Sequence, residues 1–372
     1  MFFQRYIVPG LVIMAVMVGG GYATGRELVE FFVSKGPATG LVGMAFTAAI
    51  IGAIAMISFE LARQFRTFDY RSFCKVFLGR FWWLFELAYL ATLLIVLSVV
   101  SSAAGKLLLE MTGTPEALGS VAFMILVAFL VLFGNSFIER VISAWSVLFY
   151  IAYGAMFVMV LSRFGNELNT ALASSPVHLG EAAWSAVSYT GYNVAVVPIL
   201  IFVARHFRTR SEALIAGAIA GPLILLPGFA LLMALTAFYP SNLNDPIPVT
   251  TILQRLDVQW LALLVKLVIL GALIKTGAGM LHGLNERIER AMHDKGSTMP
   301  SWVRPAVALG CMVFAVYAAS AVGIVALIAN GYRYASYVFW LVFLIPVFTY
   351  GVYLASRGRS QPAAAVSEAT GS

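Results

Sequence analysis

Three adjacent glycines interrupt the first apolar segment of this chain, and two charged residues follow them. The glycines are Gly19, Gly20 and Gly21, and the charged pair is Arg26 and Glu27. A helix that faces lipid carries neither feature, because non-helical backbone and ionisable side chains are tolerated in a membrane where protein or a water-filled cavity surrounds them. A glycine-interrupted helix near the middle of a membrane is typical of the binding site of a transporter. The segment therefore predicts a protein that moves a small polar solute.

The composition predicts a polytopic membrane protein. Of the 372 residues, 61% are hydrophobic and 11% are charged, whereas soluble domains carry about 25% charged residues. The net charge of +7 does not indicate a nucleic-acid partner, because the basic residues lie in short clusters between apolar segments, where they set the orientation in the membrane. No motif predicts a cofactor, and Cys74 and Cys311 form neither a disulfide framework nor a metal motif.

Apolar stretches of about 20 residues, the length that crosses a bilayer, predict ten spans, of which the first and the sixth are interrupted. Their ranges are 5–33, 38–62, 82–105, 116–133, 138–161, 180–204, 212–237, 252–281, 304–328 and 334–355. Most Lys and Arg residues then fall in loops on one side of the membrane. The positive-inside rule makes that side cytoplasmic and predicts that both ends of the chain are cytoplasmic, in a bacterial inner membrane.

Ten spans divide into five and five, which predicts an all-α membrane protein built as a five-plus-five inverted repeat with helices one and six discontinuous. The first repeat covers residues 1–163 and the second covers 174–356, and residues 357–372 form a polar tail that we expect to be disordered and cytoplasmic. Pro198 clashes with the carbonyl four residues back, so the break in helix six is expected between Gly191 and Val194.

Three motifs resemble the YkvI-like bacterial membrane proteins, a family related to the amino acid–polyamine–organocation superfamily. The first is Gly-Gly-Tyr-Ala-Thr-Gly-Arg-Glu-Leu-Val-Glu-Phe-Phe at 20–32, and the others are Ser-Tyr-Thr-Gly-Tyr-Asn at 188–193 and Lys-Thr-Gly-Ala-Gly at 275–279. The resemblance implies a LeuT-type fold and the architecture of a transporter, without identifying the substrate.

The first helix break is a candidate site for a solute carboxylate. The positive end of the half-helix that begins near Gly25, together with the Arg26 side chain, favours an anion there. The alternatives are that Arg26 extends to the membrane surface or pairs with Glu27, Glu30 or another helix. The substrate-binding residues predicted in this segment are Gly20, Gly21, Tyr22, Thr24, Gly25 and Arg26.

The sixth span contributes the other half of the predicted site, through Tyr189, Thr190, Gly191 and Asn193. Unwound carbonyls there could hold an ammonium group or a cation, and Tyr189 or Tyr192 could cover the solute. The alternative is a proline kink in which the hydroxyls bond back to the helix.

The LeuT-type resemblance implies that the eighth span faces the break in the first and helps to form an ion site. Thr276 could supply an oxygen to sodium together with Val18 and Gly21, or the Lys275 ammonium could replace the ion. Glu27 is a further candidate for ion coupling. A structural ion pair of Lys275 with a carboxylate is the alternative.

Other features are expected to be structural. The spacing of Gly36 and Gly40, and of Gly217 and Gly221, predicts close helix packing. Aromatic groups typical of the membrane interface occur at Trp82–Trp83, Trp302 and Tyr332–Tyr334.

The expected function is that of a secondary active transporter by alternating access, with proton or sodium coupling. Its partners are a small-molecule solute, most suitably an amino acid or related metabolite, the coupling ion and the lipid bilayer. A solute-sensing receptor on the same fold is the alternative. The chain has no nucleotide-binding loop and no catalytic motif, so neither direct use of ATP nor an enzyme is expected.

Overall fold

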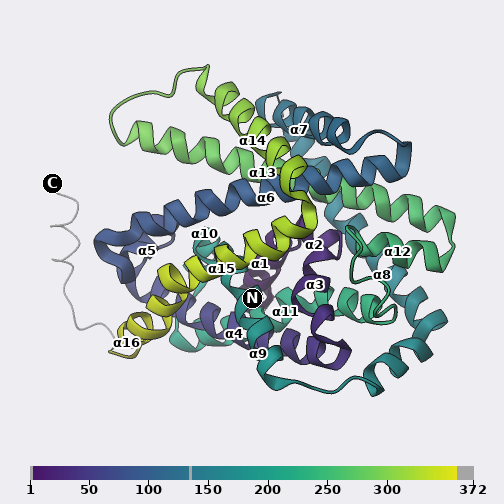
Figure 1. The fold of residues 1–372 in the computed structure, drawn as a ribbon. Coiled ribbons are helices and arrows are strands. Elements are labelled where there is room, and N and C mark those ends of the chain that lie inside the picture. Colours follow the sequence, from purple (N-terminus) through teal and green to yellow (C-terminus); the bar gives the residue numbers. More distant parts are fainter. Residues whose placement is uncertain (1–2, 134–135, 358–372) are drawn as a thin grey trace.

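The computed structural model describes residues 3–133 and 136–357, and the regular structure in these residues is helical. Figure 1 shows three short helices of the first span, α1 to α3, in the middle of the bundle, with longer helices around them. The elements are η1 (Phe3–Ile7), α1 (Val8–Met17), α2 (Gly20–Ala23), α3 (Arg26–Phe31), η2 (Val33–Lys35), α4 (Pro37–Phe65), α5 (Tyr70–Leu78), η3 (Gly79–Phe81), α6 (Trp82–Thr112), α7 (Glu116–Phe133), α8 (Ser136–Ala173), α9 (Leu179–Asn193), α10 (Val196–Ile199), η4 (Ile201–His206), α11 (Arg210–Thr236), α12 (Pro248–Leu256), α13 (Gln259–His293), α14 (Val303–Ala326), η5 (Leu327–Tyr332), α15 (Arg333–Phe339), η6 (Trp340–Leu344), η7 (Val347–Gly351) and α16 (Val352–Arg357).

The protein is an all-helical membrane protein. Within the described residues, 6 helical stretches are long and apolar enough to cross a membrane. They are Pro37–Phe65, Tyr70–Thr112, Val147–Ala173, Arg210–Thr236, Gln259–His293 and Val303–Arg357. Their apolar surfaces suit contact with lipid, and each helix satisfies its own backbone hydrogen bonds there.

Glycines allow the close contact between α4 and α11. A Cβ atom on Gly217 or Gly221 would overlap the α4 backbone at Met56 or Ala48. Likewise, a Cβ on Gly40 would lie 2.7 Å from the Phe32 carbonyl oxygen. These glycines therefore act in packing, as their spacing predicts.

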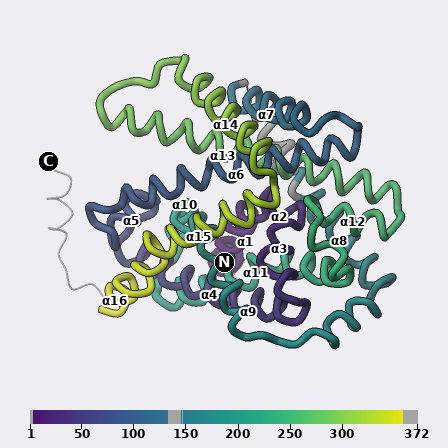
Figure 2. The backbone as a smooth tube through the Cα atoms, in the orientation of Figure 1, coloured from purple at the N-terminus to yellow at the C-terminus, as the bar shows by residue number. Residues whose placement is uncertain are grey.

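The first span is broken twice. After α1, Gly19 has an extended backbone (φ −101°, ψ −170°), and between α2 and α3 Gly25 is left-handed (φ 79°), a conformation that glycine adopts without the steric cost of a Cβ. The predicted discontinuity of helix one is confirmed, and α2 is a single turn between the two breaks. Figure 2 follows this segment as a purple tube in the middle of the molecule.

The sixth span loses its regular helix slightly later than predicted. α9 runs to Asn193, so Gly191 is still helical, and a turn at 194–195 precedes the four-residue α10 and the 3₁₀ segment η4. Pro198 lies within α10. The structure therefore places the discontinuity at the C-terminal edge of the predicted interval.

Two predicted boundaries differ from the structure. The span predicted at 252–281 is two helices, because Asp257 between α12 and α13 takes a left-handed conformation (φ 51°), which Asp tolerates better than most residues. α13 then continues to His293, since hydropathy marks the apolar part of a helix and the polar residues after it remain helical.

The bend between the last two predicted spans also lies elsewhere. The chain turns at Gly323 (φ 76°, ψ 159°), before the predicted boundary at 328, and η5 continues directly into α15. A left-handed glycine inside an apolar run leaves no signal in hydropathy. The tail predicted at 357–372 lies outside the described residues except for Arg357, the last residue of α16.

Candidate functional site

Two consecutive residues of α13 bridge the first break in helix one. The Thr276 hydroxyl accepts a hydrogen bond from the Gly20 N–H (2.9 Å) and donates to the Ala272 carbonyl (3.0 Å). The Lys275 ammonium donates to the Ala15 carbonyl at 3.2 Å. α13 therefore holds the end of α1 and the start of α2, and it faces the break as the resemblance implies.

Two of the three oxygen atoms predicted for a sodium site, those of Thr276 and Gly21, are already engaged within the protein. The Thr276 hydroxyl faces an amide N–H, whose partial positive charge opposes a cation, and the Gly21 carbonyl accepts a bond from the Thr24 hydroxyl at 2.7 Å. Val18, the third predicted ligand, has a non-helical backbone (ψ 75°) just before the break. In this conformation the Lys275 ammonium contacts the carbonyl of Ala15 in helix one.

The Glu27 carboxylate is buried beside the glycine run. The residue is 6% exposed, and its Oε2 atom accepts a hydrogen bond from the Tyr192 hydroxyl at 2.7 Å. Its Oε1 atom occupies the space that a Cβ on Gly21 would need. Gly21 is thus glycine because the Glu27 side chain folds over it, and the Tyr192 bond joins the first broken helix to the sixth.

Aromatic side chains surround this bond, and we call Phe31, Tyr189, Tyr192 and Tyr332 the tyrosine cluster. The Tyr192 and Tyr332 rings stack with centroids 4.4 Å apart. Phe31 lies 5.7 Å from both Tyr189 and Tyr192. The cluster joins α3, α9 and η5 and encloses a carboxylate in a largely apolar environment.

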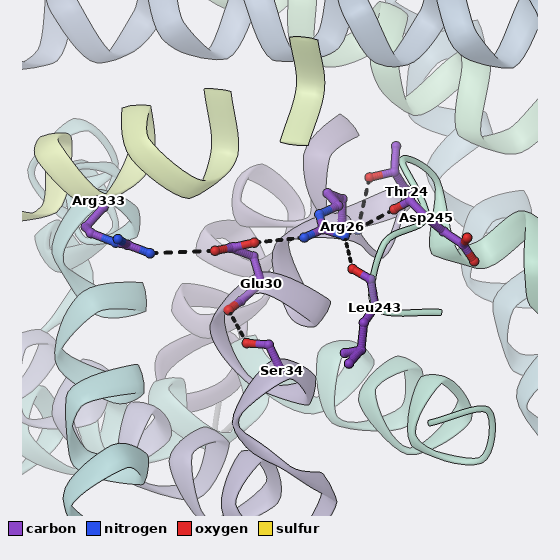
Figure 3. Close-up of polar contacts among 7 residues, drawn as sticks. All are labelled: Thr24, Arg26, Glu30, Ser34, Leu243, Asp245 and Arg333. Carbon is purple, nitrogen blue, oxygen red and sulfur yellow. Dashed lines mark hydrogen bonds and ion pairs between the residues drawn. The ribbon is translucent and has the colours of Figure 1, made fainter. Parts of the chain in front are cut away.

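The Arg26 side chain is turned away from the cluster into an ion-paired network. It is 4% exposed; Nη1 donates to the Leu243 carbonyl (2.6 Å) and the Asp245 carbonyl (3.2 Å), and Nη2 donates to Glu30 (2.8 Å). Glu30 also lies 3.6 Å from Arg333 of α15. Figure 3 shows this arginine network, with Glu30 between the two guanidinium groups. This pairing with Glu30 is the alternative role expected for Arg26. Both Nη atoms are bonded within the protein, and the buried Nε atom has no hydrogen-bond partner among the described residues.

Tyr22 of α2 connects the break to a cavity between α8 and α11. The cavity has a volume of about 410 Å³, and its lining is mainly apolar; it includes Tyr22, Phe149, Tyr153, Phe157, Phe229 and Met233. The Tyr22 hydroxyl is buried without a hydrogen-bond partner among the described residues and packs against Gly228. Tyr153 of α8 donates to the Ala23 carbonyl at the second break.

The remaining predicted binding residues have mixed surroundings. Thr24 and Gly25 shape the second break, since the Thr24 hydroxyl also accepts a bond from the Arg26 N–H at 3.3 Å. Asn193 donates to the Tyr189 carbonyl at 3.0 Å, one turn back in α9, and is bonded within its own helix. The Thr190 hydroxyl is fully buried and has no partner among the described residues.

Gly191 has a packing role in this structure. A Cβ at Gly191 would lie 2.6 Å from the Ser336 side chain, whose hydroxyl donates to the Ser188 carbonyl at 2.5 Å and accepts from the Tyr192 N–H at 3.2 Å. Ser336 of α15 thus fills the space beside Gly191 and ties α9 to α15.

Sequence reasoning missed several residues of this region. Tyr332 was expected in an interfacial belt, but it is 2% exposed and stacks on Tyr192, so that expectation is wrong. Tyr153 and Ser336 carry no local signal, because each is a polar residue within an apolar span. Glu30 lies four residues after Arg26, a spacing that brings two side chains together on a helix, and it was named as a partner of Arg26.

The described residues contain no group of three His, Cys, Asp or Glu side chains placed to hold a metal ion. No family model matches the chain. The chain is 26% identical over 336 residues to the uncharacterized membrane protein YkvI of Bacillus subtilis, and the match covers 88% of this chain and 91% of YkvI. The chain thus resembles YkvI over most of its length. The resemblance predicted from the three motifs is confirmed.

Solved transporters share the fold of this protein. A manganese transporter from Eremococcus coleocola superposes with a TM-score of 0.59 at 13% identity, over 93% of this chain and 78% of the transporter. A Na⁺-coupled sialic acid symporter gives a TM-score of 0.59 at 14% identity, over 94% and 83% of the two chains. Both are transporters of LeuT-like fold rather than enzymes. At these identities the likeness concerns the fold.

Proposed function

We propose that this protein is a secondary active transporter of a small polar solute that works by alternating access. The observation that carries the proposal is the twice-broken first helix, which polar side chains of α9, α8 and α13 contact through hydrogen bonds. Discontinuous helices near the middle of a membrane form the sites of such transporters, and the fold is shared with solved transporters. An amino acid or related metabolite is the proposed solute.

The proposed topology has ten crossings of the bacterial inner membrane, arranged as inverted repeats at 1–163 and 174–356, with both ends cytoplasmic. Two observations support it: the discontinuous segments are the first of each proposed repeat, and both meet at the Glu27–Tyr192 bond. In this orientation the arginine network lies on the external side of the break, where Lys35 ends the first span. The ion pair of Glu30 with Arg333 then has to open for a solute to enter from outside.

The proposed site lies between the two discontinuous helices. Gly20, Gly21, Tyr22 and Thr24 supply its first wall, and the second wall is made by Tyr189, Thr190, Tyr192 and Asn193 of α9. Arg26 is proposed as a residue of the external closure rather than as the anion ligand, since both of its Nη atoms are engaged by Glu30 and the loop carbonyls.

The proposed coupling site is on α13. Lys275 and Thr276 bond to opposite sides of the first break. Loss of either bond would therefore remove a contact that holds α1 or α2 against α13. The contact of the Lys275 ammonium with the Ala15 carbonyl supports a lysine that takes the place of a bound cation, which favours proton coupling over sodium coupling.

Transport by the purified chain tests the proposal. Proteoliposomes that hold only this protein and are preloaded with unlabelled amino acids should accumulate a labelled amino-acid mixture by counterflow. The same exchange should be tested with labelled uracil as a solute of another class. Specific binding of a probe without exchange would contradict transport and support the receptor alternative. Labelling of a cysteine at position 372 from outside intact cells would contradict the proposed topology.

A further inference from the structure

The Glu27 carboxylate has no positively charged partner among the residues that the structure describes. The ten ion pairs of the described residues do not include it, and the Tyr192 hydroxyl is its hydrogen-bond donor. An ionised carboxylate in such a buried place is costly unless it is paired, because water no longer solvates the charge. Glu27 therefore needs a positive charge, such as a proton or a cationic group, that the described residues around it do not supply.

Two other charged side chains of the first span and of α13, Arg26 and Lys275, do not meet this need. Arg26, its neighbour in the chain, is engaged by Glu30 and two loop carbonyls. Lys275 contacts helix one before the first break, at Ala15, whereas Glu27 lies after the second break. The charges on either side of Glu27 are thus directed elsewhere.

The other titratable groups around Glu27 are neutral phenols. Tyr22 of α2, Tyr189 and Tyr192 of α9, and Tyr332 of η5 all lie within electrostatic reach of the carboxylate. Aromatic faces attract organic cations, and a carboxylate among them is the chemistry that recognises an ammonium group. Tyr192 fixes one carboxylate oxygen, while the other lies over Gly21 at the break.

We propose that Glu27 binds the positively charged amino group of the solute and holds a proton when the solute is absent. The inference rests on the proposed transport function. When the ammonium group pairs with Glu27, the carboxyl O–H bond breaks and the proton leaves to the aqueous side from which the solute came. The carboxylate is neutralised in both states, so binding of an amine and binding of a proton exclude one another.

Proton release on binding is the direct test. The purified protein in weakly buffered detergent solution is mixed with putrescine or with an amino-acid mixture, and a pH indicator reports the protons released. The wild type should release close to one proton per amine bound. Glu27→Gln should release none and bind about 30- to 4000-fold more weakly, the range expected when one partner of a buried charge pair is removed. Glu181→Gln, an exposed residue of α9, is the matched control and should behave as the wild type.

The probes distinguish two solute classes that carry an amino group, simple amines and amino acids. Binding of putrescine alone identifies a simple amine as the solute class, and binding of the amino-acid mixture identifies an amino acid. Equal affinity of Glu27→Gln and the wild type for the bound probe would overturn the inference. The inference would also be overturned if Glu27→Gln exchanged amines normally but no longer accumulated them in response to a proton gradient. Glu27 would then bind a proton but not the amino group of the solute.

Failure of the inference can be told apart from failure of the proposed function. Wild-type exchange of uracil but of no amine would overturn the ammonium assignment and leave transport standing. Absence of exchange for every probe would contradict the transport function and this inference with it. If Glu27→Gln does not fold, Glu27→Asp replaces it: an unchanged affinity would overturn the inference, and a weaker affinity with proton release retained would support it. Tyr192→Phe should weaken binding several-fold but preserve proton release.

Discussion

The arginine network and the tyrosine cluster lie on the same short helix, α3, yet they treat charge in opposite ways. Arg26 is held by a carboxylate and two carbonyls, whereas Glu27, the next residue, has a single phenol as its donor. Consecutive residues of a helix point about 100° apart, so neighbours in sequence enter different surroundings. The difference teaches that adjacent charges of one helix can have different roles: the partners of Arg26 lie within the protein, whereas we propose that Glu27 takes its partner from the solute.

The largest effect is expected at Lys275, a third charged residue, which contacts α1. Lys275→Ala removes the ammonium that bonds to Ala15, so accumulation driven by a proton gradient should be lost while counterflow exchange persists. Uptake into proteoliposomes with and without a pH gradient measures both. Normal gradient-driven accumulation by the variant would show that Lys275 has no coupling role, and a sodium requirement in the wild type would point to Thr276 and the carbonyls of helix one instead.

Replacing the two neighbours should separate structure from binding. Arg26→Ala breaks a buried ion pair and should destabilise the protein by about 3–5 kcal/mol. Glu27→Gln keeps an acceptor for Tyr192 and should change the free energy of unfolding by less than about 1 kcal/mol. Denaturation of the two variants in detergent measures the contrast, with Arg255→Ala, an exposed residue, as the control. Equal destabilisation by the two substitutions would remove the distinction between the network and the cluster.

A substitution at Gly21 tests whether the position of the Glu27 carboxylate matters for transport. Gly21→Ala places a methyl group where the Glu27 carboxylate lies, so either α2 or Glu27 has to move, at a cost of about 1–3 kcal/mol. We expect weaker solute exchange, because the carboxylate loses its position beside the break. Gly279→Ala, on α13 in open space, is the control. Unchanged exchange in Gly21→Ala would show that the position of Glu27 over Gly21 has no functional role.

The smallest effect is expected at the edge of the arginine network. The Arg333 side chain is 44% exposed and lies 3.6 Å from Glu30, and such pairs contribute about 0–1 kcal/mol. Arg333→Gln should therefore increase external labelling of Thr190→Cys about fivefold at most, in a background without the native cysteines. Arg255→Gln is the matched control. Slower labelling in Arg333→Gln would contradict a closing role for this pair.

Much of helix one was predictable from sequence because backbone chemistry is local. Three adjacent glycines and Gly25 predict non-helical backbone, and the structure has both breaks there. The end of α9 was less well predicted, since the clash caused by Pro198 can be relieved at several nearby residues. Gly191 was placed at the start of the break expected from Pro198, but its neighbour Ser336 comes from a distant helix and gives it a packing role.

The sequence by itself determined that the protein is a membrane protein with a broken first helix, because hydropathy and glycine content act within a few residues of the chain. The tertiary structure decided which charges are paired. Arg26 meets the loop at Leu243, Glu27 meets Tyr192, and Tyr332 turns from an expected surface position into the cluster. These contacts join residues more than 100 positions apart, and their partners depend on how the helices pack, which no local pattern specifies.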